Sequence, residues 1–213
     1  MAKRAYGQFC GLVRALELVG ERWTLIIVRD LLVGPQRFSD LRRGLPRIPT
    51  NILSARLKEL EQAAIVHRRI LPRPSGSVVY ELTEYGNELE EIVLRLGRWG
   101  ARLLTKPGPE EIVTANSMIM AMRSTFRPKE ARGLDVSYEL RLGEVVIHMS
   151  IKNGRLTAAE GALPDADLVI KTGPGVKVLM TGEVSPAEAI ANRSVRLSGD
   201  SRLLSRFVDT FHI

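Results

Sequence analysis

Residues 37–82 have the sequence RFSDLRRGLPRIPTNILSARLKELEQAAIVHRRILPRPSGSVVYEL, and this stretch decides the fold of the first half of the 213-residue chain. Ser39 can cap a short helix over residues 40–43, and Thr50 can cap a longer one that ends near residue 64, because a hydroxyl there accepts a hydrogen bond from the first helical turn. The Gly-Leu-Pro sequence between them ends the first helix. The pattern predicts a helix-turn-helix pair.

A β-hairpin is expected directly after this pair. Residues 66–71 and 78–82 are runs typical of strands, and the intervening residues 72–77, PRPSGS, are typical of an exposed turn that carries a basic side chain. Upstream, apolar residues at helical spacing predict helices over residues 9–19 and 23–31. Elements of these types in this order predict a winged helix.

The longer helix of the pair has one apolar and one polar face. Leu53, Leu57, Leu60 and Ala64 form the apolar stripe, so the opposite face carries the short and polar side chains that a helix needs to approach base edges in the major groove. An ordinary solvated helix face is the alternative, but it does not account for the neighbouring hairpin and arginines, which suit phosphates or the minor groove. The predicted DNA-binding residues are Arg37, Arg47, Thr50, Asn51, Ser54, Ala55, Lys58, Arg69 and Arg73.

The net charge of +7 is concentrated in the first half of the chain. Residues 1–104 carry 17 Lys and Arg against 11 Asp and Glu, whereas residues 105–213 carry 14 against 13. Residues 37–73 alone hold nine basic side chains and three acidic ones. A clustered positive field attracts polyanions, so the charge favours nucleic acid as the partner of the predicted winged helix.

The first half resembles the HxlR family of MarR-like winged-helix regulators over residues 10–99. The resemblance implies a dimeric transcription regulator that binds promoter DNA in a sequence-specific way. The matching residues are Cys10, residues 20–27 (GERWTLII), 37–41 (RFSDL), 53–60 (LSARLKEL) and 80–83 (YELT), and Gly86.

A further helix after the hairpin is expected to dimerise. Its apolar residues alternate at spacings of three and four, which is the pattern of a seam between paired helices, although the seam could also pack on its own domain. A homodimer would place two recognition helices about 34 Å apart, so we expect a two-fold related operator. The predicted dimerisation residues are Leu89, Ile92, Leu96, Trp99 and Leu103.

A second domain is expected over residues 105–213, because the sequence TKPGP at residues 105–109 is typical of a linker and the charge balance changes there. Alternating apolar residues and an Asn153-Gly154 pair suited to a tight turn predict an α+β domain with an antiparallel sheet. The expected strands are 136–142, 145–151, one from Arg155, 166–171 and 194–198, and the expected helices are 110–126, 176–180, 186–192 and 200–211.

This half resembles the sterol-carrier-protein-like (SCP2-like) fold over about residues 135–211. The resemblance rests on residues 167–170 (DLVI), 179–182 (LMTG) and 195–200 (VRLSGD), and Asn192-Arg193 departs from the glycine usual before the penultimate strand. It implies a cavity for an apolar effector, since such domains can enclose fatty or sterol-like molecules. Flexible apolar side chains suit such a pocket, with plain core packing as the alternative, and the candidates are Met118, Met122, Phe126, Met149 and Met180.

Other chemistry finds little support in the sequence. Cys10 lies at the start of the first helix and is a candidate redox residue, although we expect it to be buried for structural reasons. His148 falls on the polar face of its strand, where we expect it to be solvated. Three dispersed histidines and one cysteine predict no metal site, and no cofactor is expected. With no signal sequence or membrane span in view, a cytoplasmic location is expected.

The sequence therefore predicts a homodimeric transcription regulator, expected to be a repressor, that is controlled by an apolar effector in its second domain. An apolar-metabolite or lipid carrier whose winged helix mediates protein contacts is the alternative, and the basic segment 37–73 argues against it. No constellation of catalytic residues is found, so an enzyme is not expected.

Overall fold

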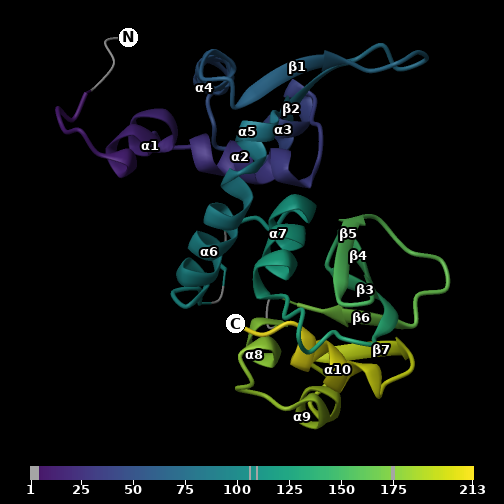
Figure 1. Cartoon of the computed structure of the whole chain (residues 1–213). Coiled ribbons are helices and arrows are strands. Elements are labelled where there is room, and N and C mark those ends of the chain that lie inside the picture. Colours follow the sequence, from purple (N-terminus) through teal and green to yellow (C-terminus); the bar gives the residue numbers. More distant parts are fainter. Residues whose placement is uncertain (1–4, 106, 109, 174–175) are drawn as a thin grey trace. The chain divides into compact units, whose positions relative to one another are not determined.

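The computed structural model describes residues 5–105, 107–108, 110–173 and 176–213. The chain forms two compact units, Met1–Val93 and Leu94–Ile213, and the division falls within helix α6 (Leu89–Ala101) (Figure 1). Of the linker residues that suggested a boundary near residue 105, Lys106 and Pro109 lie outside the described residues.

The first unit has the winged helix-turn-helix arrangement that the sequence predicts. Strands β1 and β2 pair antiparallel from Val66 opposite Leu82 to Ile70 opposite Val78, and Gln36 forms an isolated bridge with Tyr80. The elements are α1 (Gly11–Val19), α2 (Thr24–Val33), α3 (Phe38–Gly44), α4 (Thr50–Gln62), β1 (Val66–Ile70), β2 (Val78–Leu82) and α5 (Glu84–Asn87), followed by the start of α6.

The two expected helix caps are wrong by one or two residues. The N-cap of α3 is Arg37 and that of α4 is Pro49, whose carbonyl accepts hydrogen bonds from the amides of Ile52 and Leu53. Thr50 lies inside α4, and its carbonyl accepts a bond from the Ser54 hydroxyl over 2.9 Å. Proline suits a helix start because it has no amide hydrogen to leave unpaired there.

The core of the first unit forms around α4. Leu53, Leu57 and Leu60 are all but completely buried, and α4 contacts β1. Burial of each such side chain stabilises the unit by roughly 1.5–3 kcal/mol. At the base of the hairpin, a Cβ on Gly86 would lie 2.1 Å from the carbonyl oxygen of Ile65, so only glycine fits there.

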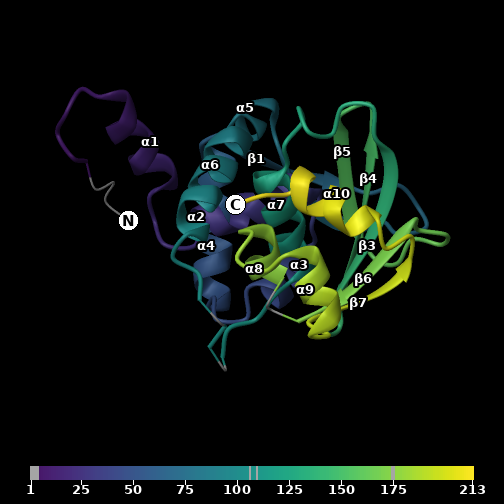
Figure 2. The same ribbon diagram turned by 90° about the horizontal axis from the view of Figure 1, so that it is seen from below.

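The second unit is an α+β domain with one five-stranded sheet in the order β5-β4-β3-β6-β7. Its helices lie on one side of the sheet (Figure 2). After α6 the elements are α7 (Ala115–Thr125), β3 (Asp135–Leu142), β4 (Val145–Lys152), β5 (Arg155–Glu160), β6 (Leu168–Thr172), α8 (Val176–Met180), α9 (Pro186–Ala191), β7 (Val195–Gly199) and α10 (Leu203–Thr210).

The expectation of a wholly antiparallel sheet is wrong, because β6 pairs parallel with β3, from Tyr138 opposite Leu168 to Leu142 opposite Thr172. The first three strands form an antiparallel meander, with Asn153 and Gly154 at positive φ in the expected tight turn. The chain then passes from β5 at one edge to the far side of β3 through residues 161–167, which we name the crossover loop (Figure 1). This return to the starting end of β3 makes β6 parallel to it.

The crossover loop is held on the sheet face that the helices leave open. The Leu163 amide donates to the Glu139 carboxylate over 2.8 Å, and the Asp167 carboxylate accepts bonds from the hydroxyl and the amide of Ser137, both over 2.7 Å. Glu139 is consequently 1% exposed, although it belongs to the polar side of β3. His148 is half-buried rather than solvated, because its Nδ1 lies 3.0 Å from the Gly161 carbonyl oxygen.

The helix side of the sheet holds an aromatic core. Tyr138 packs edge-on against Phe207 with ring centroids 5.4 Å apart, and Phe207 lies 4.9 Å from Phe211. Phe211 in turn lies 5.7 Å from Phe126 and forms a backbone bridge with it. The end of the chain is thereby fixed against the end of α7.

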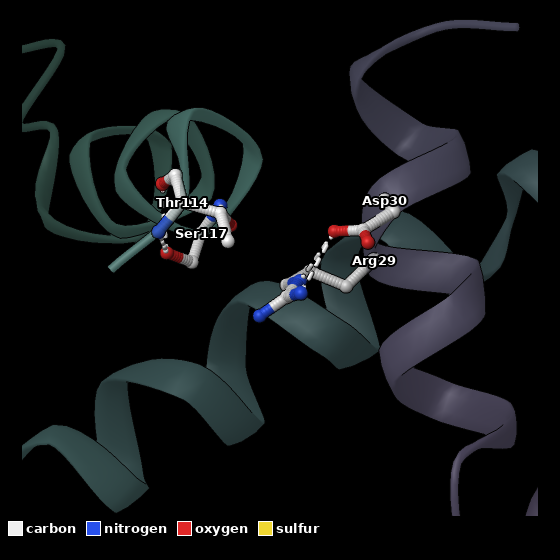
Figure 3. A network of polar contacts seen from close by, with 4 residues as sticks. All are labelled: Arg29, Asp30, Thr114 and Ser117. Carbon is white, nitrogen blue, oxygen red and sulfur yellow. Dashed lines mark hydrogen bonds and ion pairs between the residues drawn. The ribbon is translucent and has the colours of Figure 1, made fainter. Parts of the chain in front are cut away.

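Two helices of this unit are shorter than expected. Helix α7 begins at Ala115 rather than at residue 110, because Thr114 and Ser117 form a reciprocal capping box (Figure 3). Helix α10 begins at Leu203 rather than at residue 200, since Asp200 accepts bonds from the amide and the guanidinium of Arg202. A capping box of this kind satisfies amides that the helix itself leaves unpaired.

The carboxylates that hold the crossover loop predict acid sensitivity of the second unit. Bonds from the Ser137 hydroxyl and amide lower the pKa of Asp167. Burial raises the pKa of Glu139, but the Leu163 amide and Arg141 outweigh it and lower the pKa below its ordinary value. Because both folded-state pKa values are depressed, their stabilising contribution is present above the unfolded values near 4 and is lost as the pH falls through the folded values.

We expect the melting temperature of the second unit to fall between about pH 5 and pH 2, and Asp167→Asn to make this fall smaller. Asp165→Asn is the matched control, because Asp165 lies in the same loop and forms no hydrogen bond or ion pair through its side chain within the described part of the chain. Equal pH dependence of both variants in calorimetry would contradict a role for Asp167.

Candidate nucleic-acid interface

The face of α4 opposite its leucine stripe is open to solvent. Thr50, Asn51, Ser54 and Lys58 are exposed there, and Ala55 is half-buried between them. The Ser54 hydroxyl donates to its own helix, so its free lone pairs leave it as an acceptor. These side chains can offer donors and acceptors to base edges without bulk near the helix N-terminus.

The predicted basic residues of the hairpin, or wing, differ in their surroundings. Arg73 is exposed in the wing turn, whereas Arg69 is paired with Glu81 over 2.6 Å. Arg37, at the start of α3, donates to the Ser75 hydroxyl over 3.0 Å and so ties the helix-turn-helix to the wing. Arg47 is exposed in the turn between α3 and α4. The structure thus brings Arg37 and the wing turn together and leaves Arg73 as the more open wing charge.

Three ion pairs of the first unit were not predicted from the sequence. Arg56 of α4 is 12% exposed and pairs with Glu59 and, over 3.6 Å, with Glu21 in the turn before α2. Arg29 and the fully buried Asp30 pair over 2.8 Å on α2 (Figure 3). The Arg56–Glu59 spacing of three residues was a usable helical signal. The contact with Glu21 depends on tertiary packing, which no local pattern reveals.

Three of the five predicted dimerisation residues form an exposed apolar face on α6. Ile92, Leu96 and Trp99 are 58%, 47% and 64% exposed, while Leu89 is half-buried. The helix ends at Ala101, so Leu103 lies beyond it rather than in the seam. Helix α1 and the segment before it add an apolar surface that sequence reasoning missed, with Phe9, Leu12 and Leu16 exposed.

Cys10 is exposed at the N-cap of α1, so the expectation of a buried thiol is wrong for the chain taken singly. The residue lies just before α1, a helix in which only Val13 and Val19 are buried. The guanidinium of Arg14, one turn further along the helix, pairs with Glu17 over 2.7 Å.

The candidate effector residues lie on the helix side of the second sheet. Met118 and Met122 of α7, Met149 of β4 and Met180 of α8 are buried, and Phe126 is half-buried against Phe211. Helix α7 contacts both β4 and β5. Next to Phe211, the Thr210 hydroxyl is buried and has no hydrogen-bond partner within the described part of the chain. Sequence reasoning did not single out this polar atom.

Two other structural features are absent from the described ranges of the chain. No helix there is long and apolar enough to span a membrane. Nor do three or more His, Cys, Asp or Glu side chains among those residues gather where they could hold a metal ion.

Comparison with known proteins identifies the first unit. The model of the HxlR-like helix-turn-helix family matches residues 18–107. The HTH-type transcriptional regulator YodB of Bacillus subtilis (strain 168) is 39% identical over 94 residues, which are 44% of this chain and 83% of YodB. Among solved structures, the oxidised form of the redox regulator HypR is 36% identical over 44% of this chain and 96% of its own, with a TM-score of 0.41.

A more distant match involves an enzyme. The sec-alkylsulfatase Pisa1 from Pseudomonas sp. is 22% identical over 47% of this chain and 17% of its own, with a TM-score of 0.44. Similarity at this level indicates no activity. The family model and the extensive match to YodB agree with the α4 face and the wing, and this chain therefore belongs to the HxlR-like helix-turn-helix family.

Proposed function

We propose that this chain is a transcription regulator that binds a two-fold related operator in double-stranded DNA as a homodimer. The observation that supports this best is the α4 face, where Thr50, Asn51 and Lys58 are exposed opposite a buried leucine stripe. In such a complex α4 enters the major groove, and Asn51 and Ser54 contact base edges. Arg73 of the wing contacts phosphate or the minor groove.

A second copy of the chain is the partner that fits the apolar surfaces of α1 and α6. Ile92, Leu96 and Trp99 repeat at helical spacing, and Phe9 and Leu12 are 104% and 68% exposed. Full burial of one such side chain is worth roughly 1.5–3 kcal/mol, which favours association. A two-fold pair presents the same patch from both subunits, as the symmetry of the proposed operator requires.

We further propose that an apolar effector binds the second unit and releases the DNA, which makes the protein a repressor. Met118, Met122, Phe126, Met149 and Met180 would contact the effector, as flexible side chains suit varied apolar ligands. The unpartnered Thr210 hydroxyl would bind a polar group on it. The effector must bind the DNA-free arrangement more tightly, since only a difference in affinity can couple two sites.

Oxidation of Cys10 is a second candidate signal, favoured by the exposure of its thiol. The relative HypR is described as a redox regulator. The chain has one cysteine, so a disulfide would need the thiol of the partner subunit or a small thiol.

The first prediction concerns sequence discrimination. We expect wild-type protein to prefer its own upstream intergenic DNA over a scrambled duplex in fluorescence anisotropy titrations, and Asn51→Ala to reduce this preference by about 1–3 kcal/mol for a lost bidentate base contact. Gln62→Ala, at the far end of α4, is the control. No binding to either duplex at low or moderate salt would favour the carrier function instead.

The wing arginine predicts a change in salt dependence. Arg73→Ala should weaken binding to most sequences and reduce the slope of log K against log salt by about 0.9 per subunit, the value for one phosphate contact. Arg155→Ala, which removes an exposed charge from β5, should leave the slope unchanged. An unaltered slope for the Arg73 variant would exclude a phosphate contact.

The apolar face of α6 predicts the assembly state. Leu96→Glu combined with Trp99→Glu should convert the dimer into a monomer in sedimentation velocity, because it places charges in a desolvated interface. Ile190→Glu, an exposed apolar position on α9, should not. A dimer that survives the double change would place the interface elsewhere.

A further inference from the structure

The face of the second sheet that the helices leave open carries a line of three basic side chains, which we name the basic row. Arg141 of β3 lies opposite Lys171 of β6, and Lys171 lies opposite Arg196 of β7. Residues paired in this way project from the same side of a sheet. The neighbours of Lys171 and Arg196 along their strands, Ile170 and Val195, are buried on the opposite side.

Most of this charge is uncompensated. Arg141 pairs with Glu139, but Lys171 and Arg196 are exposed and have no ion pair within the described part of the chain. Arg193, in the turn before β7, is likewise exposed and unpaired among those residues. The neighbouring acid Glu144, in the turn after β3, is exposed and forms no ion pair with the row.

The carboxylates of Asp167 and Asp200 lie at the opposite end of β6 from Lys171, and Asp200 is paired there with Arg202. The Leu163 amide donates to the Glu139 carboxylate, and at the start of β6 the Asp200 amide donates to the Asp167 carbonyl. Lys171 lies near the end of the same strand. The positive charge is therefore local, even though residues 105–213 are nearly neutral in sum.

We infer that the basic row is a second DNA-binding surface, which contacts the phosphates of duplex flanking the operator. Neighbouring strands lie about 4.8 Å apart, so the row spans roughly 10 Å and presents its charges in a line. Duplex DNA offers a linear array of phosphates, and each neutralised phosphate releases counterions. An anionic membrane is less well matched, since recognition there typically takes clusters of about 4–8 basic side chains. The inference rests on the proposed function, because the winged helix would deliver the DNA.

The test uses the full chain and duplexes of two lengths, the operator alone and the operator with flanking DNA, together with a scrambled long duplex. The variant K171Q/R196Q removes the uncompensated charges of the row. The control K152Q/R155Q removes the same net charge from the β4–β5 turn, which leads into the opposite edge of the sheet. Circular dichroism and melting temperature verify that both variants fold.

We expect flanking DNA to strengthen wild-type binding and to steepen its salt dependence. K171Q/R196Q should lose this gain and lower the salt slope on both long duplexes by up to about 1.8 per subunit, corresponding to two phosphates. The control should behave like wild type. Equal salt slopes for the two variants would overturn the inference. It would also be overturned if wild type bound phosphatidylserine vesicles and K171Q/R196Q lost that binding while its salt slope on DNA stayed unchanged.

The scrambled duplex separates this inference from the proposed function. A lower slope for K171Q/R196Q without any wild-type preference for the native duplex would support the basic row and reject an operator there. If wild type prefers the native duplex but K171Q/R196Q leaves the salt slopes unchanged, the proposed function is supported and the basic row is rejected as a DNA-binding surface. Absence of DNA binding by wild type would reject both.

Discussion

The burial of one leucine stripe determines which face of α4 is available to contact DNA. Leu53, Leu57 and Leu60 fix the rotation of α4 about its own axis. Turning the helix would expose their apolar surface to water, at a free-energy cost of roughly 25 cal/mol per Å². The polar residues of the other face are exposed as a consequence and need no interaction of their own to point outward. Arg56, held by Glu21 and Glu59, adds a lateral restraint on the same helix.

Local patterns predicted most elements of both units. Periodicity located α4 and the alternating strands β3 and β4, and the Asn153-Gly154 pair located their continuation into β5. The predicted starting residues of the helices were less accurate. Ser39 and Thr50 are good capping residues by type, but the backbone enters each helix one or two residues earlier, and such shifts depend on turn geometry rather than composition.

The parallel pairing of β3 with β6 could not be predicted in the same way. Alternation shows which side of a strand faces the core, but it is silent about which strands are neighbours and in which direction they run. The sequence signal for this pairing is the pair of polar residues Glu139 and Asp167. It is not a local signal, because Asp167 bonds to Ser137, which lies 30 positions earlier in the sequence. The DNA-binding candidates could be chosen from the sequence, because residue type and position on the helix face were enough. The Arg56–Glu21 pair and the exposed apolar surface of α1 could not, because they depend on tertiary packing.

The order of strands also has a consequence for biosynthesis. The hairpin of the first unit pairs strands that follow one another in the sequence, whereas the sheet of the second unit also needs β3 to pair with β6, and β6 with β7, across longer separations. Local contacts form faster than distant ones, and domains commonly fold as they leave the ribosome. We therefore expect a nascent chain to present a folded winged helix while the rest of the protein is still being made.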